Sequence, residues 1–443
     1  MRKVVPSARA SGIARKRAKK KIREQQEKQW KNIRREDAEK RLKWLMEQQR
    51  IAKKREATVG LDRKLYKTMV EAMKNETGEK LQRWMLKLLI LAYQEARKNK
   101  RKTRDEHKFE MNEVRELLSL YNDIRLRKYK PSRGVAFIIL VPVIREIFAA
   151  PFRDRVVHHF VYLASMQFFD NQLINDAYSC RPNKGTLYGI KRLEHFIRSV
   201  SDNYHRKAYV IKLDIQGYFM SLNRKKLYAR TKMFLDKQFP RGGSKYKVCK
   251  YLWREIIFDD PVSGVRVRGN KKLWKILPAN KSLFKQPAGR GIVIGNLSSQ
   301  LLSNLYLDML DRYIYYQLGY KAYGRYVDDF YIVVAAEQKE QALRDVKAIE
   351  KFLWEELDLT LHPKKRYVQE ITRGVPFLGV VAYPYRTVAG KRFKAHFYQA
   401  VHEYMMDFRD DASITSYLGY LKHVKGVKLA TRVFASVGWE YKI

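Results

Sequence analysis

The chain has 443 residues, 45% of them hydrophobic, so it can bury a large core in more than one domain or subdomain. Its 92 lysines and arginines against 46 acidic residues leave a formal charge of +46, which indicates a polyanionic partner, nucleic acid ahead of a ribosomal or membrane-surface role. The two cysteines, Cys180 and Cys249, exclude a zinc cluster or a disulfide framework and fit a reducing cytoplasm. No apolar run has membrane-spanning length and the N-terminus lacks an apolar core, so we expect a cytoplasmic protein without a membrane span or secretory signal.

The N-terminal segment, residues 1–60, differs from the rest of the chain. Between Arg2 and Glu56 it carries 21 Lys/Arg against 7 Asp/Glu, and Pro and Gly are absent from Lys16 to Val59. This composition predicts a basic helical arm, with a tail that orders on RNA as the alternative. The apolar spacing of residues 61–127 then predicts helices, and strand-like sequence follows at Val135–Val143.

Three aspartates are predicted to meet at the ends of strands. The segment Ala208–Asp214 alternates like a strand that ends in an acid, and the segments Lys321–Val327 and Phe330–Ala335 predict a hairpin with Asp328 and Asp329 at its tip. An acidic turn between two strands is the alternative reading of the hairpin alone. A cluster of three carboxylates suits Mg²⁺, which prefers oxygen ligands and keeps water for a phosphate substrate, and two such ions are suited to nucleotidyl transfer.

Other predicted elements lie before, between and after these aspartates in the sequence. A glycine-rich loop, Gln286–Gln300, is predicted to shape a nucleotide pocket or to cap the following helix through Asn296 or Ser298. The other expected elements are a helix from Asn223, an irregular basic insertion at Gln238–Leu277, an amphipathic helix at Leu301–Tyr315, a strand at Val375–Ala382 and a helical tail at His396–Ile443.

In its order of motifs the chain resembles a reverse transcriptase over residues 129–438. The matching segments are Arg145–Arg155 and Tyr178–Thr186 in the fingers, Asp214–Phe219 as motif A, Gly291–Gln300 as motif B, Tyr326–Asp329 as motif C, Leu361–Lys365 as motif D and Gly374–Gly379 as the primer-grip motif E. The resemblance implies an α+β right-hand polymerase with fingers, a palm of antiparallel sheet and helices, and a helical thumb. It places N-terminal helices and fingers at 61–207, the palm at 208–383 with the basic insertion at about 238–277, and the thumb at 384–443.

The resemblance also implies roles for individual residues, with template RNA, a primer or cDNA, and dNTPs as partners. Asp214 and Asp328 would hold two Mg²⁺ ions with the Ile215 carbonyl, and Asp329 would be acidic support. Arg145 would contact the triphosphate, Phe219 would be the steric gate that favours DNA synthesis, and Lys365 would protonate pyrophosphate or contact the phosphate backbone. The expected template or primer contacts are Arg181, Lys184, Phe377, Leu378 and Gly379, with a plain turn as the equal alternative for the first two.

Motif B also indicates a subtype. Most reverse transcriptases place Gln-Gly at its centre and Ser-Pro at its end, whereas this chain has Ile294-Gly295 and Ser299-Gln300. This pattern is similar to that of diversity-generating retroelements, a branch of the group II intron-like bacterial enzymes. The similarity implies error-prone cDNA synthesis opposite template adenines, with a small basic multimeric accessory variability protein as partner. We expect Ile294, Gly295 and Gln300 to contact the nucleotide, where Ile294 removes a polar constraint.

Two other functions stay open at this point. One is another bacterial reverse transcriptase, of the antiphage-defence or intron type. The other is a non-catalytic RNA-binding scaffold, against which the presence of all three aspartates argues.

Overall fold

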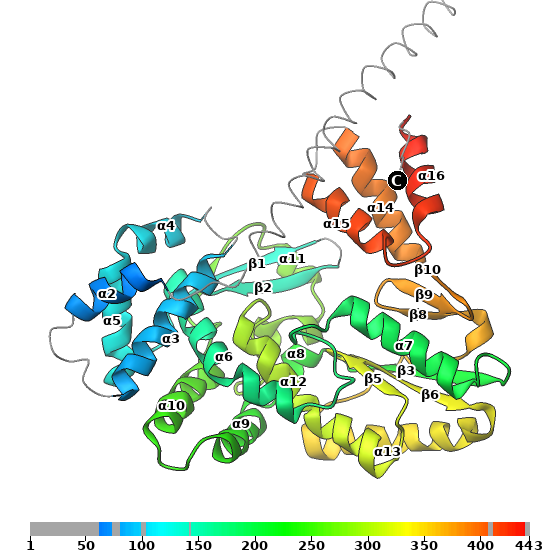
Figure 1. The fold of residues 1–443 in the computed structure, drawn as a ribbon, viewed down its shortest axis with the longest axis horizontal. Helices are drawn as coiled ribbons and strands as arrows, with labels where there is room; N and C mark the ends of the chain where they lie inside the picture. Colours follow the sequence, from blue (N-terminus) through cyan, green and yellow to red (C-terminus); the bar gives the residue numbers. More distant parts are fainter. Residues whose placement is uncertain (1–61, 73–79, 99–102, 141–142, 406–410, 439–443) are drawn as a thin grey trace, which may run out of the picture. The chain divides into compact units, whose positions relative to one another are not determined.

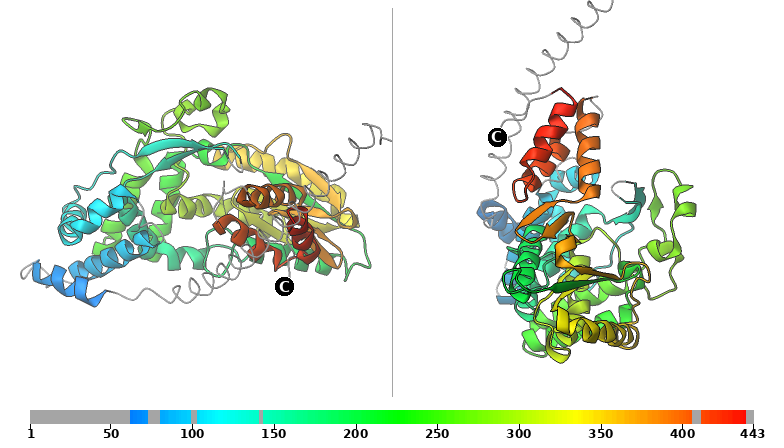
Figure 2. Two further views of the ribbon diagram at one scale, coloured as in Figure 1. Left: turned by 90° about the horizontal axis from the view of Figure 1, so that it is seen from above. Right: turned by 90° about the vertical axis from the view of Figure 1, so that its right-hand side faces the viewer.

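The computed structural model describes residues 62–72, 80–98, 103–140, 143–405 and 411–438, which divide into two compact units between Val375 and Pro376. The basic arm predicted at residues 1–60 lies outside the described residues. The elements of each unit are drawn in Figures 1 and 2. No helix of the described part is both long and apolar enough to cross a membrane.

The first unit begins with four helices, as the apolar spacing predicts. They are α2 (Arg63–Ala72), α3 (Lys80–Arg97), α4 (Arg104–Met111) and α5 (Glu113–Arg125). Helix α3 buries Met85, Leu86, Leu89 and Tyr93, which recur at intervals of three and four residues, against the long helix α6 (Phe152–Gln172). Helix α4 starts at Thr103, whose hydroxyl accepts a hydrogen bond from the amide of Glu106.

A small sheet with the strand order β2-β1-β4 follows. Strands β1 (Val135–Ile139) and β2 (Arg145–Ala149) are antiparallel, and β4 (Arg266–Val267) joins β1 in parallel from a distant part of the chain. Helices α9 (Arg224–Gln238) and α10 (Ser244–Phe258) pack together just before β4. The prediction of an irregular insertion at 238–277 is therefore wrong for α10, where Tyr246, Cys249, Trp253 and Ile257 are buried at helical spacing.

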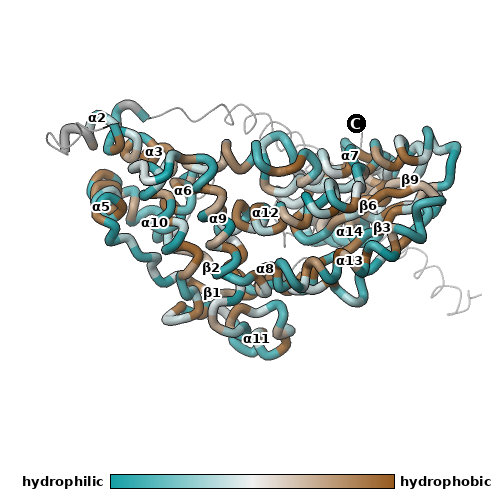
Figure 3. The backbone as a smooth tube through the Cα atoms, turned by 90° about the horizontal axis from the view of Figure 1, so that it is seen from below, coloured by the Kyte–Doolittle hydropathy of each residue, from teal (hydrophilic) through white to brown (hydrophobic). Residues whose placement is uncertain are grey.

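The main sheet has four antiparallel strands in the order β5-β6-β3-β7. These are β3 (Ala208–Asp214), β5 (Tyr323–Tyr326), β6 (Asp329–Ala335) and β7 (Tyr367–Glu370). Helices α7 (Thr186–Val200) and α13 (Lys339–Leu357) cover its opposite faces (Figure 1). Phe330, Ile332 and Val334 of β6 enter the main core, and Tyr331 packs on the other face against Phe196 of α7. Both faces are buried, which is why β3 and β6 are among the hydrophobic segments of Figure 3.

Helix α12 (Leu297–Arg312) lies inside the first unit, between α6, α9 and α13. The amphipathic helix predicted here is present, but it is buried on nearly every side. Its polar residues Ser298, Ser303, Asn304, Asp308 and Asp311 are buried as well as its leucines. Buried polar groups need hydrogen-bond partners, and the partners of Ser298, Asn304 and Asp311 lie in or beside the candidate site.

The second unit is a three-stranded sheet with three helices. Its elements are β8 (Val375–Phe377, which starts at the unit boundary), β9 (Val380–Tyr383), β10 (Arg386–Ala389), α14 (Lys391–Met405), α15 (Asp411–Leu421) and α16 (Val427–Ser436). The single strand predicted at Val375–Ala382 is instead a hairpin, because Leu378 and Gly379 both have positive φ, at 48° and 87°, and reverse the chain. The helical tail is confirmed within the described residues, and Phe397, Val401 and Phe434 form its core.

Candidate active site

Strand pairing brings the three predicted aspartates together. Asp214 ends β3 and lies opposite Asp329, the first residue of β6, in the antiparallel register. Asp328 lies in the turn between β5 and β6, and its carbonyl accepts a hydrogen bond from the Ile215 amide at 3.2 Å. We call Asp214, Asp328 and Asp329 the carboxylate cluster. The predicted hairpin with the acidic pair at its tip is confirmed.

A buried polar network holds the turn that carries Asp328. Val327 has a φ of 59°, an unfavourable conformation for a β-branched residue, so neighbouring groups must impose it. Its carbonyl accepts from Arg325 Nη1 at 2.9 Å, and its amide donates to Ser179 Oγ at 3.1 Å. Arg325 is fully buried and forms a two-pronged ion pair with Asp311 of α12, each contact being 2.6 Å. Asn304 bonds both Arg325 and Ser179 and closes the network.

This network was not predicted from the sequence. The sequence does carry a sign of this network, since Arg325 is a charged residue inside an apolar strand and Asp311 directly follows the apolar residues Met309 and Leu310. Such residues are seldom buried unless they are paired. The pairing itself depends on the packing of α12 beneath the hairpin, which the sequence does not display.

Two lysines neutralise part of the carboxylate cluster. Lys365 Nζ lies 3.0 and 2.9 Å from the two oxygens of Asp214, and Lys212 Nζ lies 2.9 Å from Asp329 Oδ2. Asp328 has no such ion pair among the described residues, and burial, followed by the charge of Asp214, raises its pKa to about 6. Burial also raises the pKa of Asp329, and Lys212 opposes that rise. The site therefore holds more negative charge than its buried surroundings favour.

The cluster has the donor chemistry for a hard divalent cation. Asp329 Oδ1 is buried and has no hydrogen-bond partner among the residues that the structure describes, and three carboxylates converge on neighbouring strand ends. Within the described ranges, no group of three His, Cys, Asp or Glu side chains forms a ready metal site as it stands, and the lysines occupy oxygens that a metal would use. The Lys365 side chain is 57% exposed and can move away easily, whereas Lys212 is 21% exposed and fixed on the central strand.

Backbone hydrogen bonds join motif A to motif B. The amide of Gly291 donates to the Leu222 carbonyl at 2.8 Å, and the amide of Ile292 donates to the Phe219 carbonyl at 2.9 Å. Phe219 lies on the short helix α8 (Tyr218–Ser221), half-buried against the main core. Gly291 has a φ of 76°, and a Cβ there would lie 3.0 Å from the Met220 carbonyl oxygen, so the close approach needs a glycine.

The predicted nucleotide contacts of the fingers and motif B are also neighbours. A Cβ on Gly295 would lie 3.6 Å from the Ile147 side chain, and Ile147 is two residues from Arg145 on the same face of β2. Arg145 is exposed, and its side chain makes no hydrogen bond or ion pair with any residue that the structure describes. Ile294 is half-buried, and Gln300 is exposed on the first turn of α12. The predicted contact of these residues with the incoming nucleotide stays a prediction.

The two loop cations before α7 have structural partners. Arg181 is buried, and its guanidinium donates to the Asp170 side chain and to the carbonyls of Asp170, Ile174 and Ala177. This arrangement fits the plain-turn alternative, since four of the five guanidinium N–H groups of Arg181 already donate within the protein. Lys184 bonds both oxygens of Asn175, and burial, with the charge of Arg181 second, lowers its pKa to about 8.

The predicted primer-grip residues lie on the β8–β9 hairpin, within the second unit apart from its first residue. Phe377 is buried, and Leu378 and Gly379 form the turn. The hydroxyl of Tyr420 on α15 donates to the Leu378 carbonyl and ties the turn to the helices of the same unit. The ring of Phe393 stacks on Tyr420 at 5.0 Å, which fixes that tyrosine.

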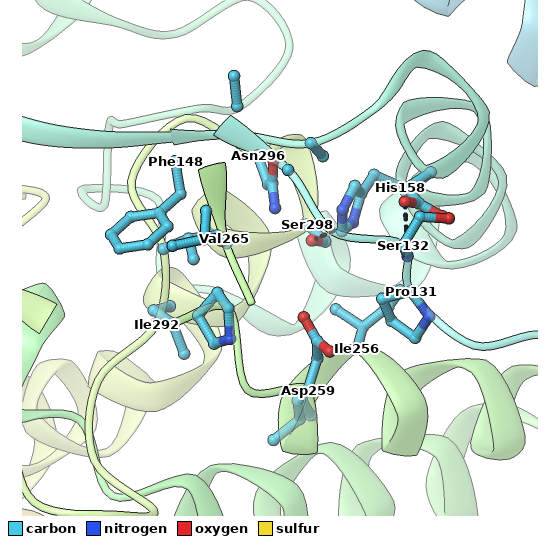
Figure 4. A pocket seen from close by; sticks show the side chains of 18 of the residues that line it. Pro131, Ser132, Phe148, His158, Ile256, Asp259, Val265, Ile292, Asn296 and Ser298 are labelled. Carbon is cyan, nitrogen blue, oxygen red and sulfur yellow. Dashed lines mark hydrogen bonds between the residues drawn. The ribbon is translucent and has the colours of Figure 1, made fainter. Parts of the chain in front are cut away.

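A cavity of about 60 Å³ borders motif B, between β2, the C-terminal end of α10 and the start of α12 (Figure 4). His158 and Ser298 line it, and their side chains are hydrogen-bonded at 2.8 Å. Asp259 also lines it, and burial raises the pKa of its carboxyl to about 6. His158 is buried, so its side chain is part of the packed core beside motif B.

Comparisons with known proteins agree with this site. The family model for reverse transcriptase (RNA-dependent DNA polymerase) matches residues 145–382, which include motifs A to E. None of the curated proteins matches the chain.

Similar solved structures share little sequence. Telomerase from Candida albicans in complex with a TWJ fragment of telomeric RNA is 11% identical, with a TM-score of 0.42 over 71% of this chain and 56% of that one. Apo telomerase from Candida tropicalis, truncated from its C-terminal domain, is 14% identical, with a TM-score of 0.42 over 63% of this chain and 60% of that one. This chain thus spans somewhat over half the length of these telomerases.

The predicted α+β fold class, with helices and antiparallel sheets, is confirmed. The family match takes in more than half of the chain and contains the whole carboxylate cluster. The chain therefore belongs to the reverse transcriptase (RNA-dependent DNA polymerase) family.

Proposed function

We propose that the chain is an RNA-directed DNA polymerase that copies a template RNA into cDNA from dNTPs. The observation that carries the proposal is the register that sets Asp214 opposite Asp329 with Asp328 in the adjoining turn, in a chain of this family. The formal charge of +46 supports a nucleic-acid template and product. In a scaffold without catalysis, nothing would compensate for three half-buried carboxylates whose negative charges repel one another, as the raised pKa of Asp328 indicates.

The cluster would hold two Mg²⁺ ions through Asp214 and Asp328, with the Ile215 carbonyl beside them. When bound, such ions would activate the primer hydroxyl and neutralise charge on the leaving pyrophosphate. Asp329 would act as acidic support, since Lys212 already occupies its Oδ2. The Arg325 network would keep Asp328 aimed at the site, because it fixes the turn on both sides of Val327.

Other residues would orient the incoming nucleotide. Arg145 is exposed on β2 and suited to the triphosphate, since a guanidinium binds phosphate oxygens in pairs. Phe219 would exclude a ribose 2′-hydroxyl, and its position is fixed by the hydrogen bond from Ile292 to its carbonyl. Lys365 lies on Asp214 and is exposed, so it could donate a proton to pyrophosphate.

We further propose that the polymerase is error-prone and belongs to a diversity-generating retroelement. Ile294-Gly295 at the centre of motif B and Ser299-Gln300 at its end support this subtype. An aliphatic side chain at Ile294 offers no hydrogen bond to the incoming nucleotide. The difference in binding free energy between a correctly paired and a mispaired nucleotide is therefore smaller. A small basic multimeric accessory variability protein would be the partner of such an enzyme.

Primer extension on an RNA template tests the polymerase proposal. Asp328→Asn removes one metal-binding charge while it keeps the shape of the side chain, and we expect extension to fall at least about 100-fold. Asp202→Asn, the same change at an exposed turn, should extend like the wild type. Extension by Asp328→Asn at the wild-type rate would contradict the catalytic assignment and favour the scaffold.

The error spectrum tests the subtype. Ile294→Gln restores an amide, so we expect fewer misincorporations opposite template adenines, whereas Ile294→Leu should keep the wild-type errors. Sequencing of the cDNA products measures both. Adenine errors that stay unchanged in Ile294→Gln would sink the explanation through Ile294, and a faithful wild-type enzyme would favour another bacterial reverse transcriptase.

A further inference from the structure

A pocket of about 400 Å³ lies between α6, α9 and α12, and none of its lining residues belongs to the carboxylate cluster or motif B. Helices α9 and α12 pack against each other there (Figure 3). Helix α9 lines it with residues 230, 233, 234, 237 and 238, and α12 lines it with residues 305, 308, 309 and 312. These intervals of three and four place each set on one helix face. A face between packed helices is normally apolar, but this one carries Arg230, Lys237, Asp308 and Arg312.

One of these charged residues is already paired with another. Arg312 Nε donates to Asp308 Oδ2 at 2.9 Å, and Arg312 Nη2 donates to the Gln172 carbonyl at 2.6 Å. Gln172 Nε2 also donates to Asp308 Oδ2, at 3.1 Å. The pair between Arg312 and Asp308 therefore cancels, and the pocket keeps the positive charge of Arg230 and Lys237.

The side chains of Arg230 and Lys237 make no hydrogen bond and no ion pair within the described part of the chain. Lys237 is exposed and can stay hydrated, but Arg230 is half-buried, and burial lowers the pKa of its guanidinium. The charges of Asp308 and Glu356 oppose this lowering only in part, so the folded protein carries a cation that has lost water without gaining a hydrogen-bonded partner within the described residues. An anion with several oxygens would satisfy Arg230 and Lys237 together, and phosphate matches the guanidinium fork.

Two other features of the pocket limit which class of ligand fits it. Asp308 is 5% exposed, and its Oδ1 is buried with no hydrogen-bond partner in the described part of the chain, so a hydrogen-bond donor is missing beside Arg230 and Lys237. Phe234 and Leu305 are buried and line the pocket, and Met233 is 58% exposed at it. A ligand that combines a phosphate, a hydroxyl or amine donor and a flat ring fits this lining, and the volume is in the range of small-molecule sites.

We propose that this pocket is a second nucleotide site, separate from the polymerase site, which binds a nucleotide phosphate through Arg230 and Lys237. The same chemistry is offered by a free nucleotide and by one nucleotide of an RNA strand. A labelled mononucleotide represents the free nucleotide and a labelled oligonucleotide represents the RNA strand, so the test uses both probes.

The test measures fluorescence of two probes bound to the full chain without primer and with EDTA. The probes are an N-methylanthraniloyl-labelled AMP and a fluorescein-labelled oligouridine of eight nucleotides. Arg230→Gln removes the half-buried charge, and Met233→Glu places a negative charge at the exposed rim, where folding is not at risk. The matched controls are Lys232→Gln on the exposed side of α9 and Met111→Glu at an exposed position of α4.

We expect each pocket variant to lose about tenfold in affinity, the worth of one charge-assisted hydrogen bond, while both controls bind like the wild type. Loss of AMP binding supports a free nucleotide as the ligand, and loss confined to the oligouridine supports an RNA strand. Equal binding of both probes by pocket variants and controls would overturn the proposal. The assay contains no primer and no metal, so its outcome is independent of the Asp328→Asn extension test.

Discussion

His158 is a buried histidine whose ionisation affects folding. It lies on α6 beside the cavity that borders motif B, is 7% exposed, and is hydrogen-bonded to Ser298 at 2.8 Å. Burial, with the charge of His159 second, lowers the pKa of His158 to about 3. The folded protein therefore keeps this imidazole neutral at pH values where the unfolded chain protonates it, at an ordinary pKa of about 6.5.

Acid should weaken the fold through this residue. As the pH falls from 7 to 5, the unfolded state binds a proton at His158 that the folded state does not, and we expect a loss of about 2 kcal/mol of unfolding free energy. This value holds as long as the folded pKa stays below about 4. Urea denaturation at both pH values should show a smaller loss for His158→Gln, by about that amount.

A surface histidine provides the control for this prediction. His205 is exposed, so His205→Gln should lose as much stability between pH 7 and 5 as the wild type does. If His158→Gln loses as much as the wild type, the neutral buried imidazole is not the cause.

At the scale of elements, the ion pair between Arg325 and Asp311 joins the β5–β6 hairpin to α12. Both side chains are fully buried, and Tyr323 also donates to Asp311 at 2.6 Å. Buried pairs add little net stability, because each charge loses its water, but the loss of one partner leaves the other without compensation. The pair therefore fixes where the hairpin lies on the helix, and with it the carboxylate cluster.

Single and double variants separate these effects. Arg325→Met should lower the unfolding free energy by about 3–5 kcal/mol, because Asp311 is left as an unpaired buried charge. Arg325→Met with Asp311→Asn should recover much of that stability while the Tyr323 hydroxyl keeps its acceptor. Primer extension should stay low in both, since the Val327 carbonyl loses its donor. A double variant no more stable than the single one would contradict the argument.

A second element-scale link attaches a basic segment to the fingers strands. Residues 261–290 contain eight Lys/Arg and no Asp/Glu, and they supply β4 to the sheet. Glu146 of β2, fully buried, accepts hydrogen bonds from Trp274 Nε1 and Ser282 Oγ, each at 2.8 Å, and from the Leu283 amide at 2.5 Å. One carboxylate thus fastens the segment at two places.

Limited proteolysis can test this attachment. Glu146→Ala removes all three acceptor contacts, so trypsin should cleave the segment at its exposed lysines, Lys271 to Lys285, several times faster than in the wild type. Glu194→Ala, an acidic residue of α7 changed in the same way, is the control. Cleavage of the segment at equal rates in Glu146→Ala and Glu194→Ala would argue against Glu146 as the anchor.

At the scale of the whole molecule, charge governs the affinity for RNA. With +46 formal charges, binding should release counterions from the phosphate backbone. For about six phosphate contacts with single-stranded RNA, affinity should fall roughly 300-fold between 50 and 200 mM salt. Fluorescence anisotropy with a labelled RNA measures this slope. An affinity that hardly changes with salt would mean that base contacts dominate.

Much of the site could be predicted because its aspartates lie on strands that local residue patterns indicate. The alternation of Ala208–Asp214 and the two arms around Asp328 and Asp329 predicted the strands correctly, since residue periodicity follows directly from strand geometry. Burial patterns were harder. Helix α10 was read as irregular because its lysines masked the buried Tyr246, Cys249 and Trp253.

The sequence by itself determined the three carboxylates, their order among the motifs and the excess of positive charge, because these depend only on residue types and spacing along the chain. Only the tertiary structure decided what surrounds them. It paired Arg325 with Asp311, turned Arg181 into a structural clamp and set Lys212 on Asp329. Such contacts join residues far apart in the chain, and burial makes an unpaired charge so costly that the packed fold selects each partner.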